Sequence, residues 1–226
     1  MIFFFKNFTK GIEKKYHDKF HTPNTLINLI RMKSDILLAG VGGQGILSIA
    51  AAIGTAALKE NLYIKQSEVH GMSQRGGAVQ SHVRLSDQPV SSDLIPQGGA
   101  QLILSMEPME ALRYLSYLNP EGWLITNNSP YKNISNYPDE ARILRQVNEV
   151  NNQINFDAKT LASELKANRS INMIMLGAAS LFLPLSQESL EEGIKTIFLS
   201  KGESVIETNI KAFRAGKEKA GSLKKA

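Results

Sequence analysis

Short apolar runs alternate with longer segments of helical character through the middle of the chain. Residues 35–39 (DILLA) are apolar and stop at a glycine, which is typical of a buried strand. Residues 46–59 are rich in Ala, Leu and Ile, which favours a helix. Apolar and polar residues alternate over 78–85, the period-2 pattern of a half-exposed strand. The pattern further predicts strands at 62–66, 101–105 and 122–127, and a helix that begins with proline at 108–118.

This order of strands and helices predicts an α/β fold, with a Rossmann-like, mostly parallel sheet, helices on both of its faces and a helical C-terminal part. Residues 171–183 are apolar all round, which indicates a buried helix that ends at Pro184. Asn172 inside this segment needs a hydrogen-bond partner, which we expect to be neighbouring backbone. Further helices are predicted at 157–168, 190–199 and 203–217.

The two ends of the chain differ from this body. Residues 1–32 combine clustered Phe with scattered Lys and show no period, so we interpret them as a poorly ordered N-terminal arm. Their apolar opening is too short for the core of a signal peptide. The predicted domain covers 33–216, and 217–226 form a basic C-terminal tail. We expect a shortened chain that starts at Met32 to fold and to stay active.

The charge distribution argues against nucleic-acid binding, although the formal net charge is +5 and the pI is about 9.3. Residues 1–32 hold six basic and two acidic residues, and residues 211–226 hold six basic and one acidic. Residues 33–210 hold 14 basic and 18 acidic residues, so the body itself is net negative. A basic groove on the body is therefore not expected. No apolar run reaches the ~18 residues of a membrane span, and we expect a cytoplasmic protein.

The chain contains no cysteine. Disulfides, a thiolate nucleophile, Cys-ligated zinc and Cys-ligated iron–sulfur clusters are therefore excluded within this polypeptide. His and carboxylate residues do not cluster at the spacing of metal ligands either, so no metal site is predicted. If the protein takes part in redox chemistry, a partner or a bound organic cofactor must carry the electrons.

A glycine turn separates the strand at 35–39 from the helix at 46–59. Its Gly-x-Gly-x-x-Gly pattern fits the dinucleotide-binding template, in which free N–H groups at a helix N-terminus bind phosphate. The equally weighted alternative is a turn used for packing or subunit contact. NAD is disfavoured because the strand at 62–66 does not end in the acid that binds the ribose. The candidate cofactor-binding residues here are Gly40, Gly42, Gly43, Gln44 and Gly45.

A second segment, 68–77 (EVHGMSQRGG), has the densest set of chemically active residue types. Arg75 could bind a carboxylate or phosphate, and His70 is a weak candidate for catalytic proton transfer. The alternative is an inter-subunit loop with a Glu68–Arg75 salt bridge. The cofactor-binding candidates of this loop are Ser73, Gln74, Arg75, Gly76 and Gly77, and the candidates for an interface or active-site wall are Glu68, His70, Gly71 and Met72. Glu107, after the strand at 101–105, is a further wall candidate, although a solvated capping role is the favoured interpretation.

Three motifs together identify a family. They are ILLAGVGGQG (36–45), EVHGMSQRGG (68–77) and NMIMLG (172–177), followed by NIKAFRAG (209–216). Over about 33–216 the chain resembles the gamma-type domain of 2-oxoacid:ferredoxin oxidoreductases. Within that family it is most similar to the small (beta) subunits of the indolepyruvate-specific type, which have this His–Arg loop.

The resemblance implies a complex that oxidatively decarboxylates aryl 2-oxoacids, forms an aryl-acetyl-CoA and CO₂, and reduces ferredoxin. It implies a large alpha subunit that holds thiamine diphosphate, Mg²⁺ and the [4Fe–4S] clusters, so that this chain alone binds no cofactor tightly and is inactive. The glycine turn and the 68–77 loop would face that subunit, at the active site or the coenzyme A channel. The expected assembly is a hetero-oligomer, with a homodimer as the alternative for the isolated chain.

A second hypothesis from a different class stays open at this point. In it the chain is an independent Rossmann-type oxidoreductase or nucleotide-binding module that binds NAD(P). The missing ribose-binding acid favours the first hypothesis. The residues of this chain do not decide which 2-oxoacid is preferred, nor the stoichiometry of the complex.

Overall fold

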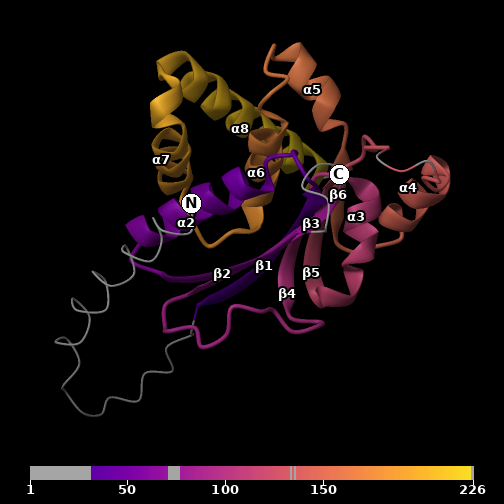
Figure 1. Ribbon diagram of the computed structural model, residues 1–226, viewed down its shortest axis with the longest axis horizontal. Helices are drawn as coiled ribbons and strands as arrows, with labels where there is room; N and C mark the ends of the chain where they lie inside the picture. Colours follow the sequence, from indigo (N-terminus) through magenta and orange to yellow (C-terminus); the bar gives the residue numbers. More distant parts are fainter. Residues whose placement is uncertain (1–31, 71–76, 133, 135, 225–226) are drawn as a thin grey trace. The chain divides into compact units, whose positions relative to one another are not determined.

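The computed structural model describes residues 32–70, 77–132, 134 and 136–224. The predictions made for the N-terminal arm lie outside these residues. At the centre is a six-stranded sheet with the order β2-β3-β1-β4-β5-β6 (Figure 1). The strands are β1 (Lys33–Val41), β2 (Tyr63–His70), β3 (Ala78–Ser86), β4 (Ala100–Ser105), β5 (Leu118–Asn127) and β6 (Gln153–Phe156).

Parallel pairing dominates one half of the sheet. β1 pairs with β4, β4 with β5 and β5 with β6, all in parallel. The other half is antiparallel, because β3 pairs with β1 on one side and with β2 on the other. The predicted mostly parallel sheet is therefore confirmed.

The second strand differs from its prediction in length and in partner. β2 continues to His70 instead of ending at 66, and it forms a hairpin with β3 at the edge of the sheet. In a dinucleotide-binding fold the acid that binds the ribose follows a parallel strand that lies directly beside the first one. β2 runs in the same direction as β1, but β3 lies between the two strands. Residue 66 therefore does not occupy the ribose-binding position of that fold, because it is neither the end of β2 nor on a strand next to β1.

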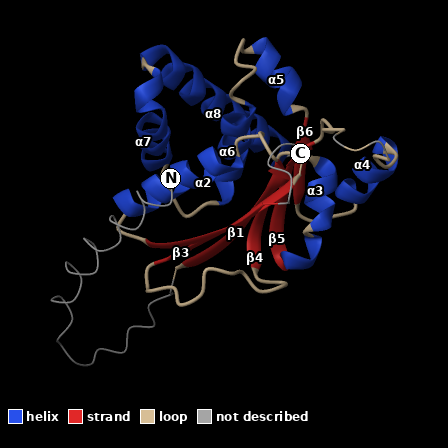
Figure 2. Ribbon diagram, in the orientation of Figure 1, coloured by secondary structure: helices blue, strands red, loops and turns tan. Residues whose placement is uncertain are grey.

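Helices cover both faces of the sheet, as predicted (Figure 2). The side chains of β1 alternate: Ile36 and Leu38 pack with α2 and α6 in the larger core, whereas Leu37 and Ala39 pack with α3 and α4 in the smaller one. The helices are α2 (Ile46–Lys59), α3 (Pro108–Arg113), α4 (Glu140–Asn148), α5 (Ala158–Glu164), α6 (Ile171–Ala179), α7 (Gln187–Phe198) and α8 (Glu203–Lys224).

The helical C-terminal part is confirmed, and its centre is the contact between α6 and α8. A Cβ atom on Gly177 of α6 would lie 1.9 Å from the carbonyl oxygen of Phe213 on α8. A Cβ on Gly216 of α8 would lie 1.9 Å from the carbonyl oxygen of Ile174 on α6. Each helix therefore needs a glycine where the two backbones meet, which explains the small residues in both motifs.

Several element boundaries differ from those predicted. The helix expected at 108–118 ends at Arg113, because the chain forms a 3-10 turn and then enters β5 at Leu118. α8 continues to Lys224, so the basic segment after 216 is helical there. The Lys224 Nζ lies 5.4 Å from the centre of the Trp123 ring, which holds the helix end against the sheet.

Within the described ranges, no helix is long and apolar enough to cross a membrane.

Candidate functional site

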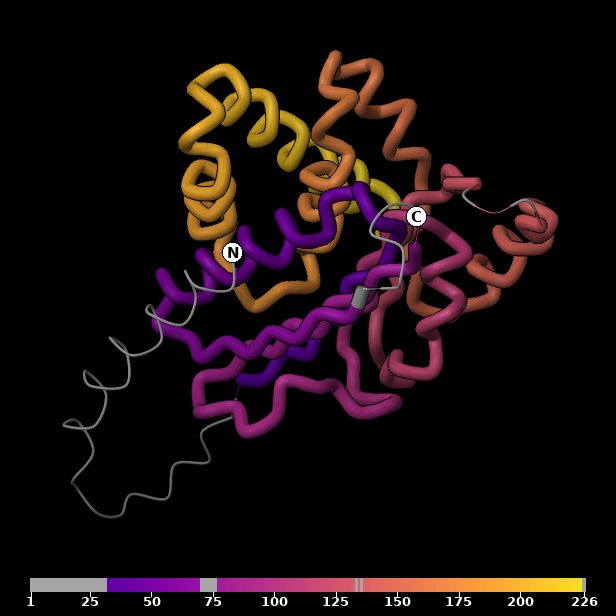
Figure 3. The backbone as a smooth tube through the Cα atoms, viewed as in Figure 1, coloured from indigo at the N-terminus to yellow at the C-terminus, as the bar shows by residue number. Residues whose placement is uncertain are grey.

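The carboxyl ends of β1 and β4 form a topological switch point. From β1 the chain passes through α2 to β2 on one side, and from β4 it passes through α3 to β5 on the other side (Figure 3). In open α/β sheets the crevice at such a point is where ligands bind. The glycine turn follows β1 there, and Met106 and Glu107 follow β4.

The glycine turn leads directly into α2. Gly43 has φ +100° and Gly45 has φ +81°, which are left-handed conformations that only glycine adopts without strain. Gly45 is the N-cap of α2, and no described side chain caps this helix end. A Cβ atom on Gly43 would meet none of the described residues within 4 Å. The turn therefore presents open backbone at the positive end of a 14-residue helix.

Two amide side chains hold the turn from within the protein. The Oε1 of Gln44 accepts a hydrogen bond from the Val41 N–H (2.8 Å), and its Nε2 donates one to the Met106 carbonyl (3.4 Å). The Nδ2 of Asn172 donates to the Gly45 carbonyl at 3.3 Å. The expected backbone partner of Asn172 is therefore confirmed. Gln44 was a candidate cofactor-binding residue in the sequence analysis. In the structure its side-chain amide is hydrogen-bonded to the protein backbone.

The 68–77 segment ends beside the glycine turn. The Gly42 N–H donates to the Gly77 carbonyl at 2.9 Å, and Val41 is the register partner of Ala78 in β3. Glu68 lies within β2, opposite Ser81. The structure thus brings the Gly77 end of the second motif to the first, whereas β3 lies between Glu68 and β1. Gly71, Met72, Ser73, Gln74, Arg75 and Gly76, and the side chain of His70, lie outside the described residues.

Glu107 is fully buried and caps α3. Its Oε2 accepts from the Glu110 N–H at 2.9 Å, and its Oε1 accepts from the Tyr131 N–H at 3.4 Å and from the Tyr137 hydroxyl. The capping interpretation is confirmed, but the expectation that Glu107 is solvated was wrong. The segment after β5 folds over the carboxylate and replaces water as its partner. Burial, together with the hydrogen bond to Glu107, raises the pKa of Tyr137, which keeps the hydroxyl a donor.

Asn127, at the end of β5, is a residue that sequence reasoning missed. Its Nδ2 donates to the carbonyls of Met106 and Ser129, each at 3.3 Å, and its Oδ1 accepts from the Ala158 N–H at 3.0 Å. The Met106 carbonyl therefore receives both the Gln44 and the Asn127 amides. A strand that ends in Asn at the carboxyl edge was the available signal.

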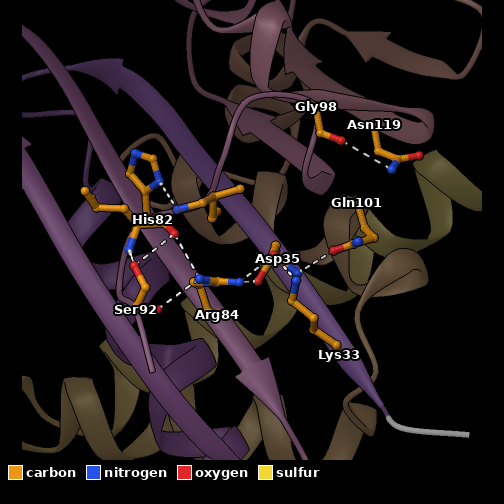
Figure 4. A network of polar contacts seen from close by, with 10 residues as sticks. Lys33, Asp35, His82, Arg84, Ser92, Gly98, Gln101 and Asn119 are labelled. Carbon is orange, nitrogen blue, oxygen red and sulfur yellow. Dashed lines mark hydrogen bonds and ion pairs between the residues drawn. The ribbon is translucent and has the colours of Figure 1, made fainter. Parts of the chain in front are cut away.

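A buried ion pair occupies the other end of β1 (Figure 4). Arg84 binds Asp35 through two hydrogen bonds, of 2.8 and 3.1 Å, and donates to the carbonyls of Ser92 and Leu94. The Nδ1 of His82 accepts from the Ile95 N–H at 3.0 Å. Burial lowers the pKa of His82, so this nitrogen stays an acceptor near neutral pH. The network fixes the connection from β3 to β4, far along β1 from the glycine turn.

The described residues contain no group of three or more His, Cys, Asp or Glu that could hold a metal ion. What the site offers is a backbone turn at a helix N-terminus, next to a loop that the sequence shows to contain Arg75. This combination suits an anionic group such as a phosphate.

Fold and site together define the class: an α/β subunit with a glycine turn at its switch point and a second glycine-rich loop beside it. Residues 35–219 match the family model of pyruvate ferredoxin/flavodoxin oxidoreductases, and the chain belongs to this family. Homologues in this family are small subunits of multi-subunit oxidoreductase complexes, which supports a hetero-oligomer. The comparisons give no support to an independent NAD(P)-binding enzyme.

Individual relatives agree with this assignment. The chain is 40% identical to the indolepyruvate oxidoreductase subunit IorB of Pyrococcus horikoshii, over 84% of this chain and 96% of the relative. It is 37% identical to IorB of Thermococcus kodakarensis, with the same shares of each chain. It also resembles a 2-oxoglutarate:ferredoxin oxidoreductase from Magnetococcus marinus, solved with 2-oxoglutarate, coenzyme A and succinyl-CoA. The identity there is 25% and the TM-score 0.68, over 86% of this chain and 32% of that longer one.

Proposed function

We propose that this chain is the small subunit of a 2-oxoacid:ferredoxin oxidoreductase that acts on indolepyruvate or a related aryl pyruvate. The complex releases CO₂, forms the aryl-acetyl-CoA and passes the electrons to ferredoxin. The observation that carries this proposal is the 40% identity to an indolepyruvate oxidoreductase subunit over nearly that subunit's whole length.

The partner in this proposal is a large subunit with thiamine diphosphate, Mg²⁺ and [4Fe–4S] clusters. Clusters of this kind are held by cysteine thiolates, and this chain has no cysteine. The cluster ligands must therefore come from another polypeptide. Thiamine diphosphate supplies the carbon nucleophile for decarboxylation, and this chain supplies backbone and side chains around the substrates.

The glycine turn and the neighbouring loop are proposed to bind the phosphates of coenzyme A at the interface with the large subunit. The position at the switch point and the open helix N-terminus support this role. Coenzyme A is the ligand we propose because the Magnetococcus marinus relative was solved with coenzyme A bound. In this proposal Gly43 and Gly45 offer backbone, Gly42 joins the turn to the loop through its hydrogen bond to Gly77, and Ser73, Gln74, Arg75, Gly76 and Gly77 are the ligand-binding residues of the loop. His70 is proposed for proton transfer.

Reconstitution tests the proposal. The chain and the large subunit are purified separately and then mixed, with methyl viologen as the electron acceptor. We expect reduction that depends on both an aryl pyruvate and coenzyme A, and only in the mixture. Calorimetry with the isolated chain should show no NAD(H) binding. Turnover of a 2-oxoacid by the isolated chain, or tight binding of NAD(H), would contradict the proposal.

A further inference from the structure

We propose that Gln44 is a positioning residue for coenzyme A: its side-chain amide spans the switch point and fixes the glycine turn in the shape that receives the phosphate. This inference rests on the proposed function. Gln44 acts through backbone groups and does not itself touch the coenzyme.

The hydrogen bonds of Gln44 close the gap where β1 and β4 end. The last register pair of these strands is Ala39–Ser105, and the Met106 N–H still donates to the Ala39 carbonyl at 2.9 Å. Beyond that point the Val41 N–H and the Met106 carbonyl need other partners, because unpaired backbone groups are costly when water is excluded. Gln44 supplies the acceptor for the Val41 N–H, and together with Asn127 it supplies the donors for the Met106 carbonyl.

Gly40 provides the space for this side chain. A Cβ atom there would lie 2.8 Å from both the Oε1 of Gln44 and the Cδ1 of Ile46, and 3.0 Å from the Cβ of Met106. The first glycine of the motif therefore leaves room for three neighbouring side chains, and Gln44 is one of them.

The other end of the turn is built in the same way. A Cβ atom on Gly45 would lie 2.5 Å from the Nδ2 of Asn172, the atom that donates to the Gly45 carbonyl. Between these two anchors Gly43 has a left-handed φ and, among the described residues, no neighbour within 4 Å of its Cβ position. The turn is therefore fixed at both ends and accessible in the middle, which is the arrangement that a bound phosphate requires.

Two substitutions separate the parts of the Gln44 interaction. Gln44→Met keeps the length of the side chain and removes both hydrogen bonds. Gln44→Glu keeps the acceptor for the Val41 N–H, removes the donor to Met106, and adds a negative charge beside the phosphate. Gln97→Met is the matched control, because Gln97 is exposed in the connection before β4.

Each variant is assembled with the large subunit, and the rate is measured while coenzyme A and the 2-oxoacid are varied in turn. For Gln44→Met we expect the KM for coenzyme A to rise about tenfold, as the loss of hydrogen bonds of ordinary strength predicts. For Gln44→Glu we expect a larger rise. The kcat and the KM for the 2-oxoacid should stay within about twofold of wild type, and Gln97→Met should match wild type.

Hydrogen exchange of the Val41 amide provides a second readout that does not depend on activity. We expect faster exchange at Val41 in Gln44→Met and near-wild-type exchange in Gln44→Glu. A wild-type KM for coenzyme A in an active Gln44→Met complex would overturn the inference, as would equal changes in kcat and in both KM values. A wild-type complex that ignores coenzyme A would instead refute the proposed function.

Discussion

The two ends of β1 are held by different chemistry. At its amino end, Asp35 and Arg84 form a buried ion pair that fixes a long connection. At its carboxyl end, the neutral amides of Gln44 and Asn172 hold a glycine turn. A neutral amide anchors backbone without adding a charge that would compete with an anionic ligand or repel it. The comparison teaches that the Asp35–Arg84 ion pair serves the fold at the end where no ligand is expected, whereas uncharged amides hold the turn itself.

The largest expected effect comes from breaking the ion pair. Arg84→Met leaves the Asp35 carboxylate buried, with only the half-exposed Lys33 among the cations that the structure pairs with it. We expect a loss of about 3 kcal/mol in the free energy of unfolding, because a buried charge loses its main partner. Chemical denaturation measures it. Arg214→Met, which breaks the surface pair with Glu191, is the control and should have a much smaller effect; equal losses would contradict the account.

A substitution near the carboxyl end of β1 should change the KM for coenzyme A rather than the free energy of unfolding. Arg75→Ala is expected to raise the KM for coenzyme A roughly 10- to 100-fold in the reconstituted complex, because a charged hydrogen bond to phosphate is lost, or else to impair assembly. Steady-state kinetics and gel filtration measure the two effects. The exposed Arg145→Ala on α4 serves as control. Wild-type behaviour of Arg75→Ala in both assays would refute the role of the loop.

The two left-handed glycines of the turn should differ. Ala at either position adopts a strained φ, which costs about 1–2 kcal/mol. Gly45→Ala also collides with Asn172, whereas Gly43→Ala does not. We therefore expect the lower Tm for Gly45→Ala, and a partial recovery when Asn172→Ala is added. If Gly43→Ala proved the more damaging change, the proposed anchoring by Asn172 would be wrong.

The smallest effect is a pH dependence confined to the amino end. The pKa of His82 is lowered by burial, so below the ordinary value of 6.5 the unfolded chain takes up a proton more readily than the folded one. Stability should fall as the pH drops from 6.5 through the folded-state pKa. His82→Gln should lose less stability than wild type over that range in urea denaturation. A larger loss in the variant would contradict the assignment.

The sequence allowed the local parts of the fold to be predicted, and topology supplied the rest. α2 has the predicted bounds, because a glycine turn precedes it and its composition favours a helix throughout. The last part of β2 was missed because Ser67 and Glu68 are polar, which an edge strand tolerates. α4 and β6 were not predicted, since α4 buries only Ile143 and Val147 and β6 has four residues.

In the candidate site, too, the local motifs were predictable from the sequence and the long-range contacts were not. Both glycine motifs could be recognised from local patterns, but their partners come from distant positions. Gln44 meets Met106 over 62 residues, and Asn172 meets Gly45 over 127. The burial of Glu107 depends on the segment around Tyr131 and Tyr137 folding over it. The pattern of apolar and polar residues does not predict such contacts, because they depend on the order of the strands in the sheet.

Hydrogen exchange of the assembled complex, with and without coenzyme A, tests the central claim most directly. The account predicts that coenzyme A slows exchange in peptides covering 42–48, the turn and the first residues of α2, and leaves peptides around Asp35 and Arg84 unchanged. Slower exchange at the amino end of β1, or no change at the glycine turn in a complex that turns over coenzyme A, would contradict it.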